Sequence, residues 1–485
     1  MTKISNFEYN FKTKPFKHQL ETFSNTAHKF EWALFMEMGT GKTKIIIDTA
    51  ALLFMEKKIN KLLVIAPKGT YRIWDSEIKV HMPDVSGQTF IWDSSITKIK
   101  LNQYQGMICS EYDGLRILLM NVESLSQKKG TDFAKAFLKS GDSMMVIDES
   151  TTIKNYRASR TKNIISLSKL AKYKRILTGT PITKSPLDLF TQCLFLGSDH
   201  LGFSSFYSFR NRFAIMEQKK FGQRSFAQVS GFQRITELNS LLSNFTTRLT
   251  KDDCLDLPKK VYITREVELT ERQKKYYREM ATRLRAEIDD EECTVTTALT
   301  KIVRLHQISC GHLVTDQENM YPIETNRLNS LLEIIEETEG KILIWATYIA
   351  DIERIEKFLK EKFGKDSTVS YYGKTKEAAR EDAIKNFQGG DQPRFFVGNP
   401  QTGGYGLTLT ASATVVYYSN SYNLEHRLQS EDRVHRIGQT QNVTYVDLVA
   451  RNTVDERIIS CLTAKRNISD EVLGDKLKDW LSISP

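Results

Sequence analysis

The stretch MEMGTGKT, residues 36–43, decides the fold of this chain. The apolar run 32–35 precedes it, and a helix-compatible run, 43–53, follows it. A strand, a glycine turn and a helix in this order are typical of a phosphate-binding loop. The glycines let backbone N–H groups turn towards an anion, and the start of the helix adds partial positive charge. The sequence therefore predicts a nucleotide phosphate site here.

The pattern of this loop assigns a role to each of its residues. Gly39, Thr40 and Gly41 would line the phosphates. Lys42 would reach the outermost phosphates, and the Thr43 hydroxyl would hold Mg²⁺. The usual spacing asks for glycine at position 36, where this chain has methionine. A glycine turn that merely ends a strand is the alternative that this stretch leaves open.

Length and composition narrow the class of protein. The chain has 485 residues, which predicts two to four domains. Its hydrophobic content of 40% is typical of a globular protein. It has no apolar run of about 18 residues, so we expect no membrane span. Its N-terminus lacks an apolar secretory core, so we expect an intracellular protein, for example in the cytoplasm of a bacterial or phage-infected cell.

Charge and cysteine usage indicate partners and compartment. The net charge of +10 favours a polyanionic partner, although a soluble protein that is merely basic fits equally well. Six scattered cysteines without a C-x-x-C pair argue against a zinc ribbon or a disulfide framework and fit a reducing compartment. Cys310 and His312 form the one metal-like spacing, but a lone pair does not complete a four-ligand site.

Short apolar runs alternate with helix-compatible stretches along most of the chain. These runs are 62–66, 117–120, 144–148, 175–178, 342–346, 394–397, 414–418 and 443–449. Near-continuous apolar strands that alternate with helices are typical of parallel sheets covered on both faces. Because the runs fall into two groups, the sequence predicts an α/β fold with two parallel-sheet lobes.

The region between the two groups has a different pattern. In residues 271–288, Tyr276, Met280, Leu284 and Ile288 stand four apart, which predicts one stripe of a helix. We therefore expect the region between the lobes to be helical. The expected domains are a first lobe at 1–198, helical protrusions and a linker at 199–325, and a second lobe with a short C-terminal brace at 326–485.

Polar side chains in the first half suit nucleotide chemistry. The Gln19 amide offers a donor and an acceptor that match the edge of adenine, although such residues are more often solvated. Asp148 ends an apolar strand and would hold Mg²⁺, and Glu149 would position or deprotonate the attacking water. The residues 178–180, which follow another strand, would sense phosphate state or form an ordinary turn.

The second half contributes glycines and arginines. Gly403 and Gly404 follow a strand, where they indicate close backbone approach to a ligand or a tight loop. Arg433 and Arg436 are three residues apart and share one face if the segment is helical. Two guanidinium groups on one face suit the γ-phosphate of a nucleotide, but a surface ion-pair patch is the alternative.

Together these segments resemble the Swi/Snf group of superfamily 2 helicase-like ATPases, from about residue 16 to about residue 454. QSEDRVHRIGQ, residues 429–439, is the most specific of them. The others are MEMGTGKT (36–43), LLVIAPKGT (62–70), DESTTIKN (148–155), RILTGTPI (175–182), RLTKDD (248–253) and LTERQ (269–273). The resemblance implies two RecA-like lobes with ATP between them and double-stranded DNA across both.

The resemblance also implies roles for individual residues. Gln19 would read adenine, and Glu149 would be the catalytic base. Lys42, Thr43 and Asp148 would bind the phosphates and Mg²⁺. Arg433 and Arg436 would act from the second lobe, with Gln429 nearby. The nucleic-acid track, mainly backbone contacts, would include Lys68, Asn121, Tyr372, Gly373, Gly403 and Gly404.

Two departures from the family pattern qualify these expectations. The usual Asp-Glu-Ala-His has Ser150 and Thr151 in its last two places, which bears on coupling more than on hydrolysis. Asn399 and Pro400 replace a Ser-Thr pair, which bears on DNA contact. The resemblance thus implies a monomeric, DNA-dependent ATPase that translocates on duplex DNA and remodels protein–DNA complexes or branched DNA. Whatever directs it to a substrate would be either absent or supplied by another protein. The alternatives are an RNA or single-strand helicase, a restriction-system motor, and a non-hydrolysing ATP-dependent binding module.

Overall fold

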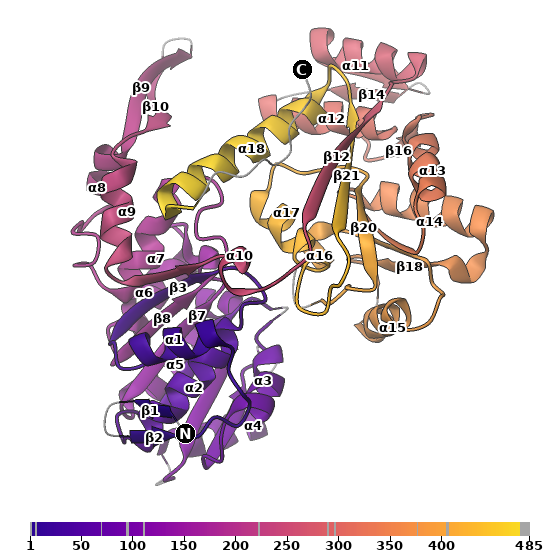
Figure 1. The fold of residues 1–485 in the computed structure, drawn as a ribbon. Helices are drawn as coiled ribbons and strands as arrows, with labels where there is room; N and C mark the ends of the chain where they lie inside the picture. Colours follow the sequence, from indigo (N-terminus) through magenta and orange to yellow (C-terminus); the bar gives the residue numbers. More distant parts are fainter. Residues whose placement is uncertain are drawn as a thin grey trace. The chain divides into compact units, whose positions relative to one another are not determined.

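The computed structural model describes most of the chain. The described residues are 2–4, 7–68, 70–93, 97–109, 112–221, 224–288, 291–294, 297–375, 377–403 and 407–475. The chain divides into two compact units (Figure 1). Unit 1 is Met1–Asp256 with Ile468–Leu477, and unit 2 is Leu257–Asn467 with Lys478–Pro485. The boundary at 256 differs from the three-part division that we expected.

In the described part of unit 1, seven strands form one sheet in the order β11-β3-β8-β7-β4-β6-β5. The strands are β3 (Glu31–Met36), β4 (Lys61–Ala66), β5 (Gly87–Ile91), β6 (Leu115–Asn121), β7 (Ser143–Asp148), β8 (Tyr173–Leu177) and β11 (Thr246–Leu249). Every neighbouring pair is parallel. The predicted parallel sheet is therefore confirmed.

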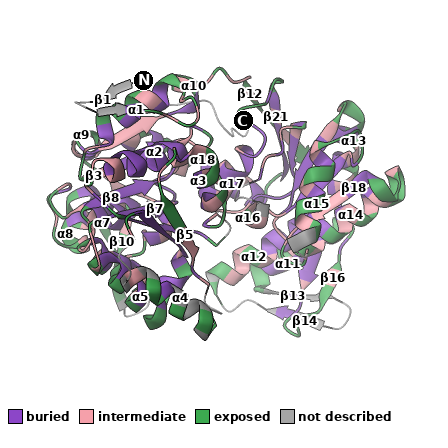
Figure 2. Ribbon diagram, turned by 90° about the horizontal axis from the view of Figure 1, so that it is seen from below, coloured by how far each residue is buried: buried purple, intermediate pink, exposed green. Residues whose placement is uncertain are grey.

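Both faces of this sheet are buried, because successive residues of a strand point to opposite sides. In β4, Leu63 and Ile65 join one apolar cluster, and Leu62 and Val64 join the other. The second cluster includes side chains of α1 (Lys17–Thr26), α2 (Lys42–Met55) and α3 (Ile73–His81). The first includes side chains of α4 (Lys98–Cys109), α5 (Lys128–Lys139), α6 (Ser159–Ser168), α7 (Leu189–Leu196), α8 (Phe206–Phe213) and α9 (Ile235–Ser243). Figure 2 shows α5 with one buried and one exposed side.

Strand order brings three chain segments to one edge of the unit 1 sheet. β8 lies between β3 and β7, with Leu177 opposite both Leu34 and Asp148. Ligands bind outside the carboxyl ends of strands in open α/β sheets. A ligand site is therefore expected beside the segments that follow Met36, Leu177 and Ile147.

Unit 2 has its own sheet, with six described strands in the order β12-β21-β20-β17-β19-β18. They are β12 (Lys260–Val267), β17 (Lys341–Trp345), β18 (Thr368–Tyr371), β19 (Phe395–Gly398), β20 (Ser412–Tyr417) and β21 (Val443–Ala450). All neighbours are parallel. Ile342 and Ile344 face α13 (Arg327–Glu337) and α14 (Ile349–Phe363), while Leu343 and Trp345 face the cluster that contains Phe387 of α15 (Glu377–Gln388).

The region 199–325 is mixed, so our expectation of a helical region was wrong. β11 and β12 belong to the two large sheets. β9 (Ala214–Phe221) and β10 (Arg224–Phe232) form a hairpin next to α8 and α9 (Figure 1). The predicted helix over 271–288 ends early: α11 is Glu271–Arg283, Leu284 has a left-handed φ of 60°, and Ile288 lies in β13 (Arg285–Ile288).

The remaining elements are short, apart from two helices. The helices are α10 (Lys251–Cys254), α12 (Ala298–Cys310), α16 (Pro400–Gly403), α17 (Leu424–Glu431) and α18 (Val454–Leu473). The antiparallel pairs are β1 (Thr2–Ile4) with β2 (Phe7–Tyr9), β13 with β14 (Glu291–Thr294), and β15 (His312–Val314) with β16 (Met320–Pro322). Among the described residues, no helix combines the length and apolar character that crossing a membrane requires.

Candidate functional site

The loop between β3 and α2 has the geometry of a phosphate cradle. Gly39 and Gly41 have φ angles of 80° and 86°, which favour glycine. A Cβ atom on Gly41 would lie 2.1 Å from Nε2 of Gln19, so a side chain there would displace the Gln19 amide. Lys42 donates from Nζ to the carbonyl oxygens of Met36 (2.8 Å) and Glu37 (3.2 Å). The ammonium group therefore lies inside the turn.

These residues fit an anionic group. Lys42 begins α2, a helix of 14 residues whose first N–H groups have no partner within the helix. Its buried ammonium binds carbonyl oxygens of the turn that leads into α2, so one turn carries both a cation and a helix N-terminus. Thr43, the next residue, is half-buried. The structure thus brings together the predicted phosphate ligands.

Gln19 packs directly on this loop. Its Oε1 accepts from the backbone N–H of Phe16 at 3.0 Å, and its Nε2 donates to the carbonyl oxygen of Thr40 at 3.2 Å. An amide group has two N–H hydrogens and two acceptor positions, so one of each is left after these bonds. That capacity matches the predicted contact with adenine, which stays a prediction.

Asp148 and Glu149 stand at the end of β7. The two oxygens of Asp148 accept from the Trp74 indole Nε1 (2.9 Å) and from the Glu149 backbone N–H (3.0 Å). Burial raises the pKa of the Asp148 carboxyl, against the opposing effects of Trp74, Lys42 and the Glu149 N–H. Glu149 has φ 48° and ψ 64°, a left-handed conformation that costs a non-glycine residue about 1–3 kcal/mol.

The turn after β8 joins these two segments. The Thr178 hydroxyl donates to Oε2 of Glu149 at 3.2 Å and accepts from the backbone N–H of Thr180 at 3.1 Å. A Cβ atom on Gly179 would lie 3.1 Å from the backbone nitrogen of Met38, so this glycine lies against the phosphate loop. Three sequence segments therefore meet at one end of the sheet.

Ser150, which departs from the family pattern, has a buried hydrogen-bond partner. Ser150 donates from its hydroxyl to Oε1 of Gln192 at 2.7 Å. The Gln192 amide nitrogen in turn donates to the carbonyl oxygens of Pro181 (2.8 Å) and Asp188 (2.7 Å). The segment 148–155 is thereby tied to the segment after Thr178, so a physical link between them exists without histidine.

Arg248 connects the edge strand β11 to the same region. One guanidinium nitrogen donates to the carbonyl oxygens of Phe35 (3.0 Å) and Gly179 (3.3 Å). Its Nε donates to Oδ1 of Asp475 at 3.0 Å. Asp475, which follows α18 in unit 1, therefore contacts the arginine that binds β3 and the turn after β8.

In unit 2, Arg433 and Arg436 converge on one atom. Both donate to the carbonyl oxygen of Leu407, at 3.3 and 3.0 Å. They lie in the turn after α17, so the shared side that we predicted does not come from a helix. Arg433 also donates to the carbonyl oxygen of Gln429 at 2.9 Å. The Gln429 side chain is fully buried in unit 2, where its nucleotide contact stays a prediction.

A buried ionic cluster lies at the end of α17, next to the turn that carries Arg433 and Arg436. Glu431 accepts from Arg427 (2.9 Å), Tyr262 (2.8 Å) and Lys260 (3.2 Å). Burial opposes ionisation of Glu431, but the positive charges of Lys260, Arg427 and Arg466 outweigh it and lower its pKa to about 2. Arg427 also donates to both oxygens of Asp447 in β21. The cluster fixes the end of α17, and with it the start of the turn that carries Arg433 and Arg436 (the arginine turn).

The predicted nucleic-acid residues have varied surroundings. Lys68 is exposed, and Gly373 is exposed just after β18. Asn121 caps the turn Val122–Ser126, because its Oδ1 accepts from the Ser124 N–H at 2.8 Å. Tyr372 is half-buried, with its hydroxyl 3.5 Å from Glu353. Gly403 ends α16, and Gly404 lies outside the described residues.

The metal-like spacing at 310–312 has a structural explanation. His312 Nδ1 lies 3.1 Å from an oxygen of Asp351, and Cys310 is fully buried, which raises the pKa of its thiol. Within the described part of the chain, no three His, Cys, Asp or Glu side chains are grouped as a metal site would need.

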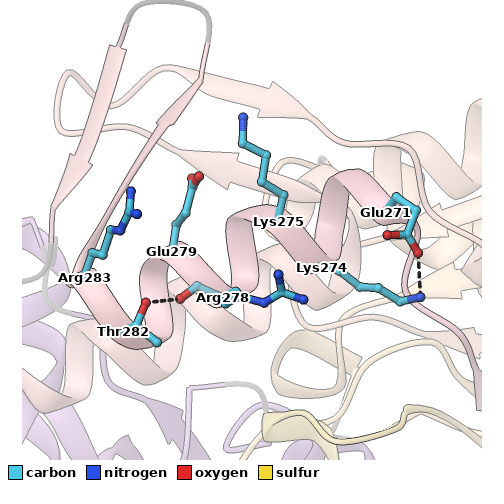
Figure 3. A pocket seen from close by; sticks show the side chains of 7 residues that line it. All are labelled: Glu271, Lys274, Lys275, Arg278, Glu279, Thr282 and Arg283. Carbon is cyan, nitrogen blue, oxygen red and sulfur yellow. Dashed lines mark hydrogen bonds and ion pairs between the residues drawn. The ribbon is translucent and has the colours of Figure 1, made fainter.

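Two surface hollows lie away from these loops. One, of about 320 Å³ in unit 1, lies among α6, α7 and Phe206, with Tyr156 stacked on Phe206 at 4.0 Å between ring centroids. The other, of about 300 Å³, lies along α11 (Figure 3). Its lining residues are Glu271, Lys274, Lys275, Arg278, Glu279, Thr282 and Arg283, so cations outnumber carboxylates on this helix.

Three residues that complete the candidate site in unit 1 were not predicted from the sequence. Trp74 contacts Asp148, Gln192 contacts Ser150, and Asp475 contacts Arg248. A tryptophan six residues after Lys68 was a visible signal, but Gln192 and Asp475 stand in segments without a distinctive pattern.

The SNF2-related domain matches residues 25–313, which is more than half of the chain. The chain belongs to the SNF2-related family of helicase-like ATPases. A helicase conserved C-terminal domain also matches residues 326–438. The SNF2-related assignment agrees with the predicted resemblance and with the two parallel-sheet lobes.

This SNF2-related chain is similar to several curated proteins. It is 26% identical over 467 residues to an uncharacterised ATP-dependent helicase of Mycoplasma genitalium, covering 94% of this chain and 42% of that protein. It is 26% identical over 492 residues to the CHD3-type chromatin-remodeling factor PICKLE of Arabidopsis thaliana, covering 93% and 34%. The chain thus spans less than half the length of these relatives. A Sulfolobus solfataricus SWI2/SNF2 ATPase core in complex with dsDNA aligns with a TM-score of 0.43 and 26% identity, covering 96% and 94% of the two chains.

Proposed function

We propose that this chain is an ATP-dependent translocase on double-stranded DNA that remodels protein–DNA complexes or branched DNA. The observation that carries the proposal is the meeting of three loops at the carboxyl ends of β3, β8 and β7. Lys42 lies in the first loop, Thr178 in the second and Glu149 in the third. This grouping supplies a phosphate ligand, a base and a side chain that positions the base.

In the proposed site, Lys42 and the first N–H groups of α2 bind the outer phosphates. Thr43 and Asp148 hold Mg²⁺, which when bound neutralises negative charge on the phosphates. Glu149 accepts the proton of the attacking water, and Thr178 holds its carboxylate in place. Gln19 contacts adenine next to the loop. Arg433 and Arg436 of unit 2 would then stabilise the charge that develops on the transferred phosphoryl group.

Duplex DNA is the proposed partner for two reasons. The chain carries a net charge of +10, and basic groups such as those on α11 suit contact with phosphates (Figure 3). Relatives carry names of DNA-directed activity, such as a chromatin-remodeling factor and a DNA annealing helicase and endonuclease. Lys68, Asn121, Tyr372, Gly373 and the glycines at 403 and 404 are the proposed backbone contacts.

Contacts of this kind predict movement without sequence preference, since phosphates carry no direct sequence information. They also predict that binding weakens steeply with salt, because each neutralised phosphate releases counterions. We propose that the protein acts as a monomer inside the cell and that a targeting protein selects its substrate.

A parallel measurement of ATP turnover tests this function. Turnover with Mg²⁺ is compared without nucleic acid and with equal nucleotide concentrations of duplex DNA, single-stranded DNA and RNA. The proposal predicts the largest stimulation with duplex DNA and displacement of a triplex strand as the protein moves. Stimulation by RNA or single strands alone would favour a helicase of that kind. A chain that binds ATP but shows no turnover under any of these conditions would be a binding module, the reading that the Ser150–Thr151 departure motivates.

A further inference from the structure

Trp74 is a buried residue that binds the proposed metal ligand Asp148. It is 2% exposed, near the start of α3, and its indole Nε1–H donates to Oδ2 of Asp148 at 2.9 Å. Asp148 uses its other oxygen to accept from the Glu149 N–H at 3.0 Å. Each oxygen of the proposed Mg²⁺ ligand is therefore held by one donor from the protein.

An indole suits this task because of its chemistry. Its nitrogen is a donor only and does not ionise near neutral pH. A carboxylate has about four acceptor positions, so the two hydrogen bonds leave room for a cation. Trp74 also belongs to a buried cluster with Val64, Ala66 and Ile78, so its ring has little freedom to turn. The direction of the Asp148 carboxylate is thus set partly by the core of unit 1.

The same tryptophan is connected to the loop that bears Lys68. The carbonyl oxygen of Pro67 accepts from the N–H groups of Thr70 (2.9 Å) and Tyr71 (3.1 Å), and α3 begins at Ile73. Lys68 is exposed on this loop, while Tyr71 is buried in the cluster that holds Trp74. Backbone hydrogen bonds and the buried Tyr71 therefore join the loop to the start of α3, which carries the indole.

We propose that Trp74 is a positioning residue that couples the Lys68 loop to the metal ligand Asp148. The coupling rests on the proposed function, in which Lys68 contacts DNA and Asp148 holds Mg²⁺. DNA that engages the loop would improve the alignment of Asp148, which raises turnover. Without the indole N–H, Mg²⁺ binding should weaken and stimulation by DNA should shrink.

The substitution Trp74→Phe tests this, since it keeps an aromatic ring and removes the N–H. Trp92→Phe is the matched control: Trp92 is also 2% exposed and in unit 1, but packs on Phe133 at 4.8 Å between ring centroids in the cluster on the opposite face of the sheet. Two quantities are measured: the Mg²⁺ concentration that half-saturates binding of a fluorescent ADP, and the ratio of turnover with and without duplex DNA.

We expect Trp74→Phe to raise the half-saturating Mg²⁺ concentration about 10-fold, the lower end of the effect of losing an outer-shell hydrogen bond. The stimulation ratio should fall in the same variant, and Trp92→Phe should change neither quantity. Equal values for the two variants in both measurements would overturn the proposal. If the wild type shows no turnover at all, the proposed function fails, while Mg²⁺-dependent ADP binding still tests the role of Trp74.

Intrinsic fluorescence gives a test that does not require Trp74→Phe to fold. In a variant whose other four tryptophans, Trp32, Trp92, Trp345 and Trp480, are replaced by phenylalanine, all tryptophan emission comes from Trp74. Adding Mg²⁺ to the ADP complex of this variant should change that emission. The half-point of that change should match the half-point of Mg²⁺-dependent ADP binding. An emission that does not respond to Mg²⁺ would contradict contact between the indole and the metal ligand.

Discussion

Thr178 donates a hydrogen bond from its hydroxyl to Oε2 of Glu149, across 3.2 Å between the ends of β8 and β7. Both residues are buried, and Glu149 has a left-handed backbone conformation. A residue in that conformation persists only where its surroundings hold it. The turn at 178–180 is therefore part of what holds the proposed base in position.

Replacing Thr178 by valine should slow ATP turnover about 10-fold and leave ATP affinity nearly unchanged. The valine keeps the shape of threonine but does not donate to Glu149. Losing this hydrogen bond should raise the activation free energy by about 1.4 kcal/mol, which corresponds to a factor of 10 in rate. Thr191→Val is the control, because the buried Thr191 hydroxyl oxygen has no hydrogen-bond partner in the described structure. Steady-state kinetics would measure the turnover of both variants, and nucleotide titration would measure their ATP affinity. Equal turnover in the two variants would refute the role of Thr178.

The Arg248–Asp475 ion pair should stabilise unit 1. Asp475→Asn leaves a largely buried guanidinium without its counter-ion, so we expect a loss of about 2 kcal/mol in the free energy of unfolding. Asp142→Asn, which breaks the exposed pair with Lys172, should change stability by less than about 0.5 kcal/mol. Denaturant titrations of both variants would measure this. A loss as small for Asp475→Asn as for Asp142→Asn would show that the pair adds little.

The buried carboxylate of Glu431 should make unit 2 sensitive to acid. Its pKa is lowered to about 2, so its ionised form stabilises the fold at neutral pH. That contribution is fully present above the unfolded pKa, near 4.5, and is lost as pH falls towards about 2. The shift corresponds to about 3 kcal/mol.

Glu431→Gln isolates this effect from other acid-sensitive groups. The difference in unfolding free energy between wild type and this variant should be largest near pH 6 and should shrink at pH 3. Glu266→Gln, at the exposed pair with Arg451, should show a small difference at both pH values. A difference for Glu431→Gln that does not vary with pH would contradict the lowered pKa.

Arg436 should matter for hydrolysis more than for binding. Arg436→Ala should reduce turnover by about 100-fold or more, since an arginine that stabilises the transferred phosphoryl group contributes at least that much. Its effect on ATP affinity should be small. Arg451→Ala removes an exposed arginine of the same unit and should leave turnover unchanged. An Arg436→Ala variant with normal turnover would exclude this residue from the site.

The buried strands were predictable from the sequence because they are continuous apolar runs. The predicted run 62–66 lies in β4, and the run 144–148 lies in β7. Both strands bury residues on two faces, which produces such runs. The phosphate loop was equally visible, because its glycines and Lys42 are required by local geometry. The arginine turn was visible as a motif, although its shape is not helical.

Edge strands and a helix end were not predictable from local pattern. β11 is a short polar strand, TTRL, that depends on its neighbour β3 for hydrogen bonds. The four-residue spacing from Tyr276 to Ile288 continues past the end of α11, where the chain turns at Leu284 into the β13–β14 hairpin. Contacts such as Trp74 with Asp148 join residues 74 positions apart, so no local pattern contains them.

DNA-dependent ATP hydrolysis with Glu149 as the base is tested by measuring ATP turnover of the wild type and of Glu149→Gln, each with and without duplex DNA. We expect duplex DNA to raise wild-type turnover. Glu149→Gln should still bind ATP but turn over at least about 1,000-fold more slowly, since it lacks the base. Equal turnover by the two proteins, or wild-type turnover that duplex DNA does not change, would contradict these expectations.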